Sequence, residues 1–277
     1  MNVTWVIESR VQGLDAEAIA IEVARQGMEH FIVRPQFSSV YPNDLVGGEN
    51  IPIDAAVVFS GTLDLYRQLD ETRNWSPLGW CDFEQLSCSS FCNHFSQYIL
   101  NQEFRILTIA DAIAQESDVY RQMNVGHKIF VRPNSVDKLF TGQLIDITDF
   151  EDFLKSKTDD YNREIFVSKP CPIEQEWRLF ISNDRIVDGC QYYLNDQFDF
   201  QSGYSDGVSE FVSEVLTNCS WRPHPLFVMD ICKSNGNLWI VELNSYNCAG
   251  LLKCDIAEFV RAASEQAKYE LSTRLGG

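Results

Sequence analysis

The sequence has 277 residues, 45% of them hydrophobic and 12% aromatic, so it can bury a substantial core and suits two or three compact units. Its 22 lysine and arginine residues face 40 aspartate and glutamate residues, which gives a formal net charge of -18. Because duplex nucleic acid requires clustered basic side chains to neutralise its phosphates, this balance argues against a duplex partner. The acidic surplus indicates solubility, with attraction of a cationic or amine-bearing substrate as the sharper alternative.

The sequence also argues against a membrane or a disulfide framework. No segment approaches the roughly 20 apolar residues of a membrane span, and no secretory apolar core follows the first residues, so we expect a cytoplasmic protein. Nine cysteines without paired spacing indicate reduced, mostly buried thiols. Cys88, Cys92 and His94 form a small cluster, but no second ligand pair follows at zinc-site spacing, so the cluster is interpreted as core.

The first hundred residues alternate between strand and helix patterns. Strands are predicted at 5–11, 30–34 and 53–61, and helices at 15–27 and 62–74. Gly27 would close the first helix and Thr62 would cap the second. No GxGxxG motif follows the first strand, so nothing indicates a dinucleotide site. This pattern predicts an α/β domain over residues 1–101.

The remaining chain reads as two α+β units, over residues 102–167 and 168–277. The first would contain strands at 103–109, 127–133, 142–147 and 163–170, with helices at 110–124 and 149–157. The second would contain hairpins at 176–193 and 225–244, with helices at 206–218 and 255–274. The strand at 142–147 is predicted to pair antiparallel with the strand at 127–133.

The last hairpin places polar side chains on one face of two largely apolar strands. If residues 227–232 and 238–244 are strands, Glu242 and Asn244 share a face, because side chains alternate along a strand. Asp230 joins them only if it pairs with an even-numbered residue, so the sequence predicts a three-residue loop over 235–237 or a compensating bulge. The apolar face would then hold Phe227, Met229, Ile231, Trp239, Val241 and Leu243, with Ile240 on the polar side.

Asp230, Glu242 and Asn244 are the predicted metal ligands. Two carboxylates and an amide on a half-buried face need a cation to offset their repulsion and desolvation. Mg²⁺ prefers oxygen ligands and takes one or two carboxylates, so it is the expected ion, with Mn²⁺ as a substitute. Glu242, in the middle, could bridge two ions. The alternative is three sheet-edge residues that face water.

A metal beside carboxylates suggests phosphate chemistry, which also needs cations to spread the charge of the transferred group. Arg132 ends a predicted strand, and Lys138 follows in a loop with Gly142 that could close over a triphosphate. Downstream, Glu176 and Arg178 share a strand face, where Glu176 could accept ribose hydroxyls and Arg178 could reach phosphates.

The segment 165–170 precedes that strand and includes Ser168 and Lys169. Its backbone could meet an adenine edge, with Lys169 nearby. A surface pair formed by Glu176 and Arg178 across strands is the competing interpretation of this region.

In chain order, the segments IFVRPNSVDKLFTG, FVSKP, EWRLFISNDRIV and FVMDICKSNGNLWIVELNSYNCAG resemble the ATP-grasp superfamily over about residues 103–263. The resemblance implies that ATP lies between the two α+β subdomains, beside the N-terminal α/β domain. Most members have a lysine where this chain has Arg132. The branch with arginine in an F-V-R-P strand followed by K-x-F-T-G, found largely in phages and bacteria, fits better.

The resemblance also implies roles for individual residues. Asp230 and Glu242 would hold one Mg²⁺, and Glu242 and Asn244 a second. Glu176 would bind the ribose, and Arg178 the phosphate or the acyl-phosphate oxygens. Arg132 and Arg178 are the expected catalytic cations, and the nucleotide would contact Arg132, Lys138, Ser168, Lys169, Glu176 and Arg178.

The implied reaction is carboxylate–amine ligation. A carboxylate attacks the γ-phosphate of ATP to give an acyl phosphate and ADP, and an amine then displaces phosphate to form an amide or peptide-like bond. Small-molecule or peptide carboxylates and amines are the expected partners, in a pocket shaped by residues 245–250 and the N-terminal domain. Two alternatives stay open: phosphorylation without ligation, and a non-catalytic nucleotide-binding interaction protein.

Overall fold

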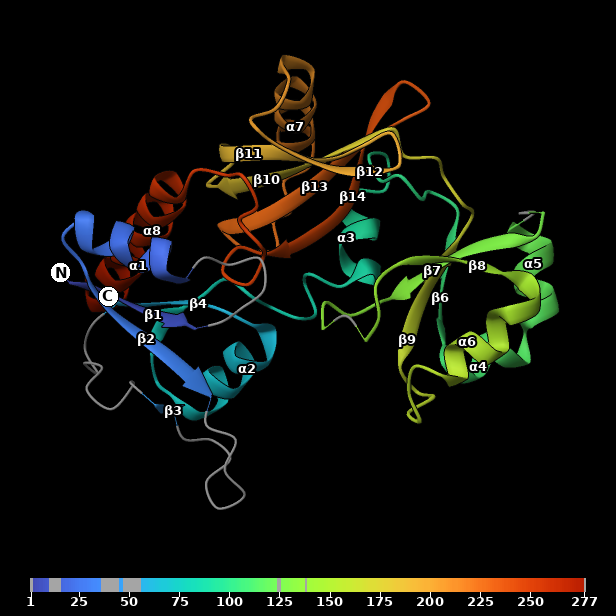
Figure 1. The fold of residues 1–277 in the computed structure, drawn as a ribbon, viewed down its shortest axis with the longest axis horizontal. Helices are drawn as coiled ribbons and strands as arrows, with labels where there is room; N and C mark the ends of the chain where they lie inside the picture. Colours follow the sequence, from blue (N-terminus) through green and yellow to red (C-terminus); the bar gives the residue numbers. More distant parts are fainter. Residues whose placement is uncertain are drawn as a thin grey trace.

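The computed structural model describes residues 2–9, 16–35, 45–46, 56–123, 126–137 and 139–276. Within these residues the strands form three sheets, at the left, top and right of Figure 1. The α/β start and the two following α+β units confirm the predicted fold class. Each predicted range contains one sheet, but the last helix, from the third range, packs against the first sheet.

The first sheet has the order β3-β2-β1-β4-β5 and is parallel except for β3. Its strands are β1 (Val3–Glu8), β2 (Glu29–Pro35), β3 (Leu45–Val46), β4 (Ala56–Ser60) and β5 (Ser76–Leu78), and its helices are α1 (Ala16–Arg25) and α2 (Leu63–Thr72). Every residue of β1 and β4 is buried, as expected for parallel strands covered on both faces. Gly27, at φ +78°, follows α1, and the Thr62 hydroxyl caps α2 by accepting from the Leu65 N–H, as predicted.

The second sheet is antiparallel and has the order β6-β9-β7-β8. Its strands are β6 (Phe104–Thr108), β7 (Lys128–Pro133), β8 (Gln143–Asp146) and β9 (Glu164–Ser168). Its helices are α4 (Ile109–Ala114), α5 (Glu116–Met123) and α6 (Phe150–Lys155), with the 3-10 turn η1 (Ile147–Asp149) before α6. The single helix predicted over 110–124 is wrong: the chain turns at Gln115, so that both Ile109 and Val119 reach the same apolar cluster.

The third sheet is antiparallel and has the order β12-β11-β10-β13-β14. Its strands are β10 (Gln175–Ser182), β11 (Arg185–Leu194), β12 (Gln197–Ser202), β13 (Leu226–Ser234) and β14 (Asn237–Ser245). The sequence pattern does not predict β12, since this edge strand is largely exposed and lacks a buried face. The helices α3 (Cys88–His94) and α7 (Asp206–Asn218) contribute to the apolar cluster on one face of the sheet.

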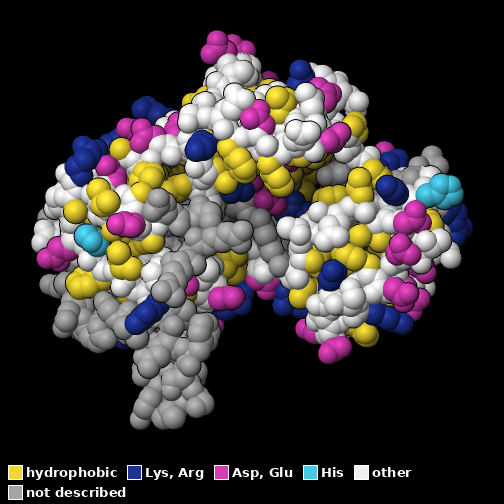
Figure 2. Space-filling view, in the orientation of Figure 1, with side chains coloured by type: hydrophobic (Ala, Val, Ile, Leu, Met, Phe, Trp, Pro, Cys, Tyr) yellow, Lys and Arg dark blue, Asp and Glu magenta, His cyan; other side chains and the backbone are white. Residues whose placement is uncertain are grey.

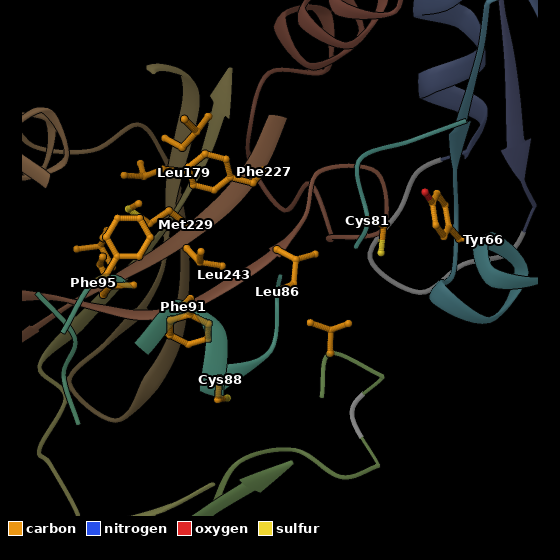
Figure 3. Packing of buried hydrophobic residues seen from close by; sticks show 14 of the residues in the cluster. Tyr66, Cys81, Leu86, Cys88, Phe91, Phe95, Leu179, Phe227, Met229 and Leu243 are labelled. Atoms are coloured by element: carbon orange, nitrogen blue, oxygen red, sulfur yellow. The ribbon is translucent and has the colours of Figure 1, made fainter. Parts of the chain in front are cut away.

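That cluster joins the third sheet to the N-terminal unit. Figure 3 shows Leu179, Met229 and Leu243 above α3, with Tyr66 and Cys81 at the far side of the cluster. Cys88 and Cys92 of α3 are buried among these residues. His94 stacks on Trp221 at a centroid distance of 4.2 Å.

The register of the β13–β14 hairpin differs from the preferred prediction and agrees with its alternative. The turn has two residues, Asn235 and Gly236, both at positive φ, so the predicted three-residue loop is wrong. A bulge at Val241 restores the register: Ile231 pairs with Ile240, and Asp230 pairs with Glu242.

The bulge also corrects the assignment of faces along β14. Ile240, predicted on the polar face, is fully buried in the apolar cluster with Met229 and Ile231. Val241, predicted on the apolar face, lines a polar cavity instead. The one-residue shift therefore changes the facing of the first half of β14 and keeps Glu242 beside Asp230.

The helix α8 (Ile256–Gly276) and the loop after β14 attach the N-terminal sheet to the rest of the chain. Trp5 donates its indole N–H to the Ser264 hydroxyl at 3.0 Å. Asn247 is fully buried; its Nδ2 donates to the Phe59 carbonyl at 2.6 Å, and its Oδ1 accepts from the Trp80 N–H at 2.9 Å. One side chain thus fixes the end of β14 against β4 and the residues after β5.

We predict that Asn247→Ala destabilises the protein by about 2–4 kcal/mol, because it leaves two buried backbone groups without their partner. Urea unfolding followed by tryptophan fluorescence measures this change. The exposed Asn162→Ala is the matched control and should shift stability by less than about 0.5 kcal/mol. Equal effects of the two substitutions would contradict the role of Asn247.

Candidate functional site

The three predicted metal ligands lie together on the third sheet. Asp230 of β13 pairs directly with Glu242 of β14, and Asn244 follows two positions later on the same strand. The Asn244 amide donates to Glu242 Oε1 at 2.9 Å and to Asp230 Oδ2 at 3.2 Å. The side chain of Asp230 is only 1% exposed, so its charge requires compensation within the protein.

Arg178 supplies that compensation from the neighbouring strand. The β10–β13 register places Arg178 directly beside Asp230, and the two side chains form a two-pronged ion pair, Nε to Oδ1 at 2.9 Å and Nη2 to Oδ2 at 2.7 Å. Nη1 donates to the Gly250 carbonyl at 3.2 Å. Burial lowers the pKa of Arg178, but Asp230 outweighs burial and holds this pKa above its ordinary value.

Arg132 reaches the same cluster from the second sheet. Its Nη2 donates to Glu242 Oε2 at 2.5 Å, and its Nη1 donates to the Val241 carbonyl at 3.3 Å. Both side chains of the Arg132–Glu242 pair are 16% exposed. Each predicted carboxylate ligand therefore has an arginine counter-ion, and the two arginines come from different sheets.

Glu176 lies on the same face of β10 as Arg178. Burial, followed by repulsion from Asp230 and Glu242, raises the pKa of Glu176 to about 7. A hydrogen bond from Tyr192 and the charge of Arg178 act in the opposite direction but are weaker. This carboxyl therefore changes charge near neutral pH, unlike an ordinary surface glutamate.

A cavity of about 420 Å³ opens between the second and third sheets beside these residues. Arg132, Glu176 and Glu242 line it, together with Phe130, Pro133, Ser135, Phe140, Thr141, Gly142, Gln143, Leu144, Ile173, Tyr192, Tyr193 and Val241. Figure 2 shows the hollow between the lobes that carry the two sheets. Its volume and its mixture of apolar walls with a few charged groups suit a small-molecule ligand such as a nucleotide.

Other predicted nucleotide contacts lie away from this cavity or are not described. Lys138 lies outside the described residues. Ser168, at the end of β9, is fully buried and donates its hydroxyl to the Lys169 carbonyl at 3.2 Å. The Lys169 ammonium pairs with Glu103 at 2.5 Å. Neither Ser168 nor Lys169 lines the cavity.

Sequence reasoning missed several lining residues. Ile173 follows the predicted adenine segment, and Tyr192 and Tyr193 end β11. The signal for the tyrosines is present in the sequence, because the predicted hairpin places the end of β11 beside Glu176. A bulge between Glu176 and Trp177 brings Glu176 opposite Tyr193.

A second, smaller cavity of about 130 Å³ lies beside Arg178 and Asn244. All three units contribute to its lining, which consists of Leu63, Val136, Arg178, Asn244, Ser245, Cys248, Ala249 and Gly250. The predicted participation of residues 245–250 and the N-terminal domain thus corresponds to a defined space. No residue is shared between the linings of the two cavities.

The donor set fits Mg²⁺. Among the described residues no three His, Cys, Asp or Glu side chains converge as a metal cluster, so the candidate site consists of two carboxylates and one amide. Such oxygen donors suit Mg²⁺, which takes one or two carboxylates and completes its shell with water and phosphate oxygens. The two arginines balance the carboxylates and make the arrangement suitable for phosphate transfer.

Comparison with known proteins identifies the family. An ATP-grasp domain family, the second of its clade, matches residues 100–262, more than half of the chain. The chain belongs to this ATP-grasp family.

Solved structures share the fold of this ATP-grasp protein over nearly its whole length. D-cycloserine synthetase is 11% identical and aligns with a TM-score of 0.65, covering 96% of this chain and 100% of that chain. D-alanine–D-alanine ligase from Bacillus anthracis, solved with ATP, is 9% identical with a TM-score of 0.62, covering 99% of each chain. These similarities confirm the predicted ATP-grasp architecture.

A curated relative has a different kind of name. The translation initiation factor eIF2 assembly protein of Schizosaccharomyces pombe is 24% identical over 103 residues. The match covers 36% of this chain and 32% of that protein, so the chain spans about a third of the relative's length.

A search of the described helices found none long and apolar enough to cross a membrane.

We predict that Glu176→Gln stabilises this ATP-grasp protein at pH 8 and not at pH 4.5. The folded-state pKa of about 7 lies above the ordinary 4.5, so the contribution of Glu176 to stability is full below pH 4.5 and is lost as pH rises through 7. Glutamine removes that loss, which amounts to about 1–3 kcal/mol. Urea unfolding of both proteins between pH 4.5 and 8 measures it.

The control for this prediction is Glu174→Gln, two positions earlier, whose side chain is 41% exposed. It should not reproduce the pH-dependent gain. A constant difference between Glu176→Gln and the unsubstituted protein over the whole pH range would contradict a raised pKa.

Proposed function

We propose that this protein is an ATP- and Mg²⁺-dependent ligase that joins a carboxylate to an amine through an acyl phosphate. The observation that carries the proposal is the position of the Asp230–Glu242–Asn244 cluster between two cavities. Glu242 borders the larger cavity and Asn244 borders the smaller one. A group transferred from one cavity to the other would pass these ligands.

The residues around the larger cavity would bind the nucleotide. Its apolar walls suit the adenine base, and Glu176 would accept hydrogen bonds from the ribose hydroxyls. Arg132 and Lys138 would contact the phosphates. Bound Mg²⁺, held by Asp230, Glu242 and Asn244, would offset the charge of the phosphates and of the transferred group.

Arg178 would act on the other side of the cluster. A carboxylate oxygen attacks the γ-phosphorus, the bond to the β-phosphate oxygen breaks, and ADP leaves. Arg178 would stabilise the oxygens of the transferred group, and an amine would then displace phosphate from the acyl carbon. Positioning and charge stabilisation account for this chemistry, so no side-chain nucleophile is required. The ligases that share the fold support this reaction class.

A second candidate function is favoured by the curated relative. Because that protein is named as an assembly protein for a translation factor, this chain could bind a nucleotide in order to act on a protein partner. The two candidates differ in products: a ligase consumes a carboxylate and an amine, whereas an assembly protein requires neither. Phosphorylation without ligation is a third outcome, marked by a stable phosphorylated product.

We predict that Glu242→Gln lowers ADP release by at least about 100-fold, because it removes a charged metal ligand and the partner of Arg132. The assay supplies ATP, Mg²⁺ and mixtures of carboxylates with hydroxylamine, an amine that captures acyl phosphates as hydroxamates. Mass spectrometry identifies the products. Glu210→Gln, on the exposed face of α7, is the matched control and should keep full activity.

The products decide between the candidates. Hydroxamate formation that depends on ATP and is lost in Glu242→Gln supports the ligase. A phosphorylated acid that accumulates unchanged in hydroxylamine would favour the phosphotransferase. Tight Mg²⁺–ATP binding without carboxylate-dependent ADP release would contradict the ligase and favour the assembly function.

A further inference from the structure

The smaller cavity has the position of an acceptor site. It touches Arg178 and Asn244, the residues that hydrogen-bond Asp230 from the side away from the larger cavity. Its walls come from the start of α2, the loop after β7 and the loop after β14. A substrate in this space would approach the cluster from the side opposite to the nucleotide.

The charge of the lining indicates a single negative group. Arg178 is the one charged side chain among the lining residues of this cavity. Its hydrogen bonds to Asp230 and Gly250 engage three of the five N–H donors of a guanidinium, which leaves donors for an incoming carboxylate. A second charge on the part of the substrate inside the cavity would lose its hydration without gaining a partner.

The remaining walls are small or apolar. Leu63, Val136 and Ala249 present aliphatic surface. Cys248 adds a thiol whose pKa is raised well above its ordinary value by burial, so it stays neutral. This surface matches an aliphatic stem attached to the carboxylate.

The volume limits the length of that stem. A space of about 130 Å³ is about four times the ~30 Å³ that one water molecule occupies in the liquid. It holds a carboxylate and a few methylene or methyl groups, and it is too small for an aromatic ring in addition.

We propose that this cavity binds the reacting carboxylate of a substrate whose reacting end is a short aliphatic monocarboxylate, with Leu63 and Val136 setting the limit on size. This inference rests on the proposed ligase function and names its substrate class. The end that enters carries one carboxylate and two to four carbons, as in a short fatty acid or the small C-terminal residue of a peptide.

The test compares acids of increasing size in the hydroxamate assay: acetate, propionate, butyrate, 3-methylbutanoate, phenylacetate and succinate. The unsubstituted protein should prefer acids of up to four carbons. Leu63→Ala should raise kcat/KM for 3-methylbutanoate relative to propionate by about 10-fold or more, as expected for space added to an apolar pocket. Ile21→Ala, at a side chain 63% exposed on α1, is the matched control and should leave the profile unchanged.

A second variant and a binding measurement separate this inference from the ligase function. Ala249→Leu should fill the cavity and abolish propionate binding in saturation-transfer NMR while the Kd for ATP stays unchanged. This readout requires no turnover, so lost propionate binding supports the site even if the reaction differs from ligation.

Three results would overturn the inference. Equal activity with phenylacetate and propionate, or an unchanged profile in Leu63→Ala, would leave the ligase standing without this substrate class. Propionate binding that survives Ala249→Leu would place the carboxylate elsewhere. Carboxylate-independent ADP release would instead contradict the proposed function.

Discussion

The buried pair of Asp230 and Arg178 is the constraint on which the site depends. A carboxylate that is 1% exposed costs several kcal/mol unless a partner of opposite charge is held in good geometry. The β10–β13 register supplies that geometry, since it places the two residues opposite each other in the sheet. Any shift of β10 along β13 would leave both charges buried and unpaired, so the ion pair and the strand register stabilise each other.

The bulge in β14 extends the same constraint to the neighbouring strand. A regular hairpin closed by the two-residue turn would place Val241 opposite Asp230 and turn Glu242 to the other face. With one extra residue in β14, Glu242 faces Asp230 and Ile240 enters the apolar core beside Met229. The polar site and the core therefore both require the bulge, which is why an irregular feature persists in a buried strand.

Local patterns in the sequence predict much of this arrangement, and the limits have physical causes. The Thr62 cap and the set of Asp230, Glu242 and Asn244 follow from capping, alternation and oxygen donors at spacing two. The choice between a loop and a bulge could not be predicted, since both give the same local signal and the choice depends on packing against α3 and β10. Asn247 gives no signal in the pattern either, because its two hydrogen bonds join the loop after β14 to backbone groups more than a hundred positions away.

The two ion pairs at the cluster have different mechanical consequences. The Arg178–Asp230 pair lies within one sheet, so movement of the second sheet against the third leaves it intact. The Arg132–Glu242 pair spans the two sheets, so opening the larger cavity must stretch or break it. A cation at Glu242 would weaken the hold of Arg132 on β14, whereas phosphates contacting Arg132 would replace it with new pairs across the same gap. The local balance of two acids and two arginines, rather than the net charge of -18, thus determines how this cleft responds to an anionic ligand.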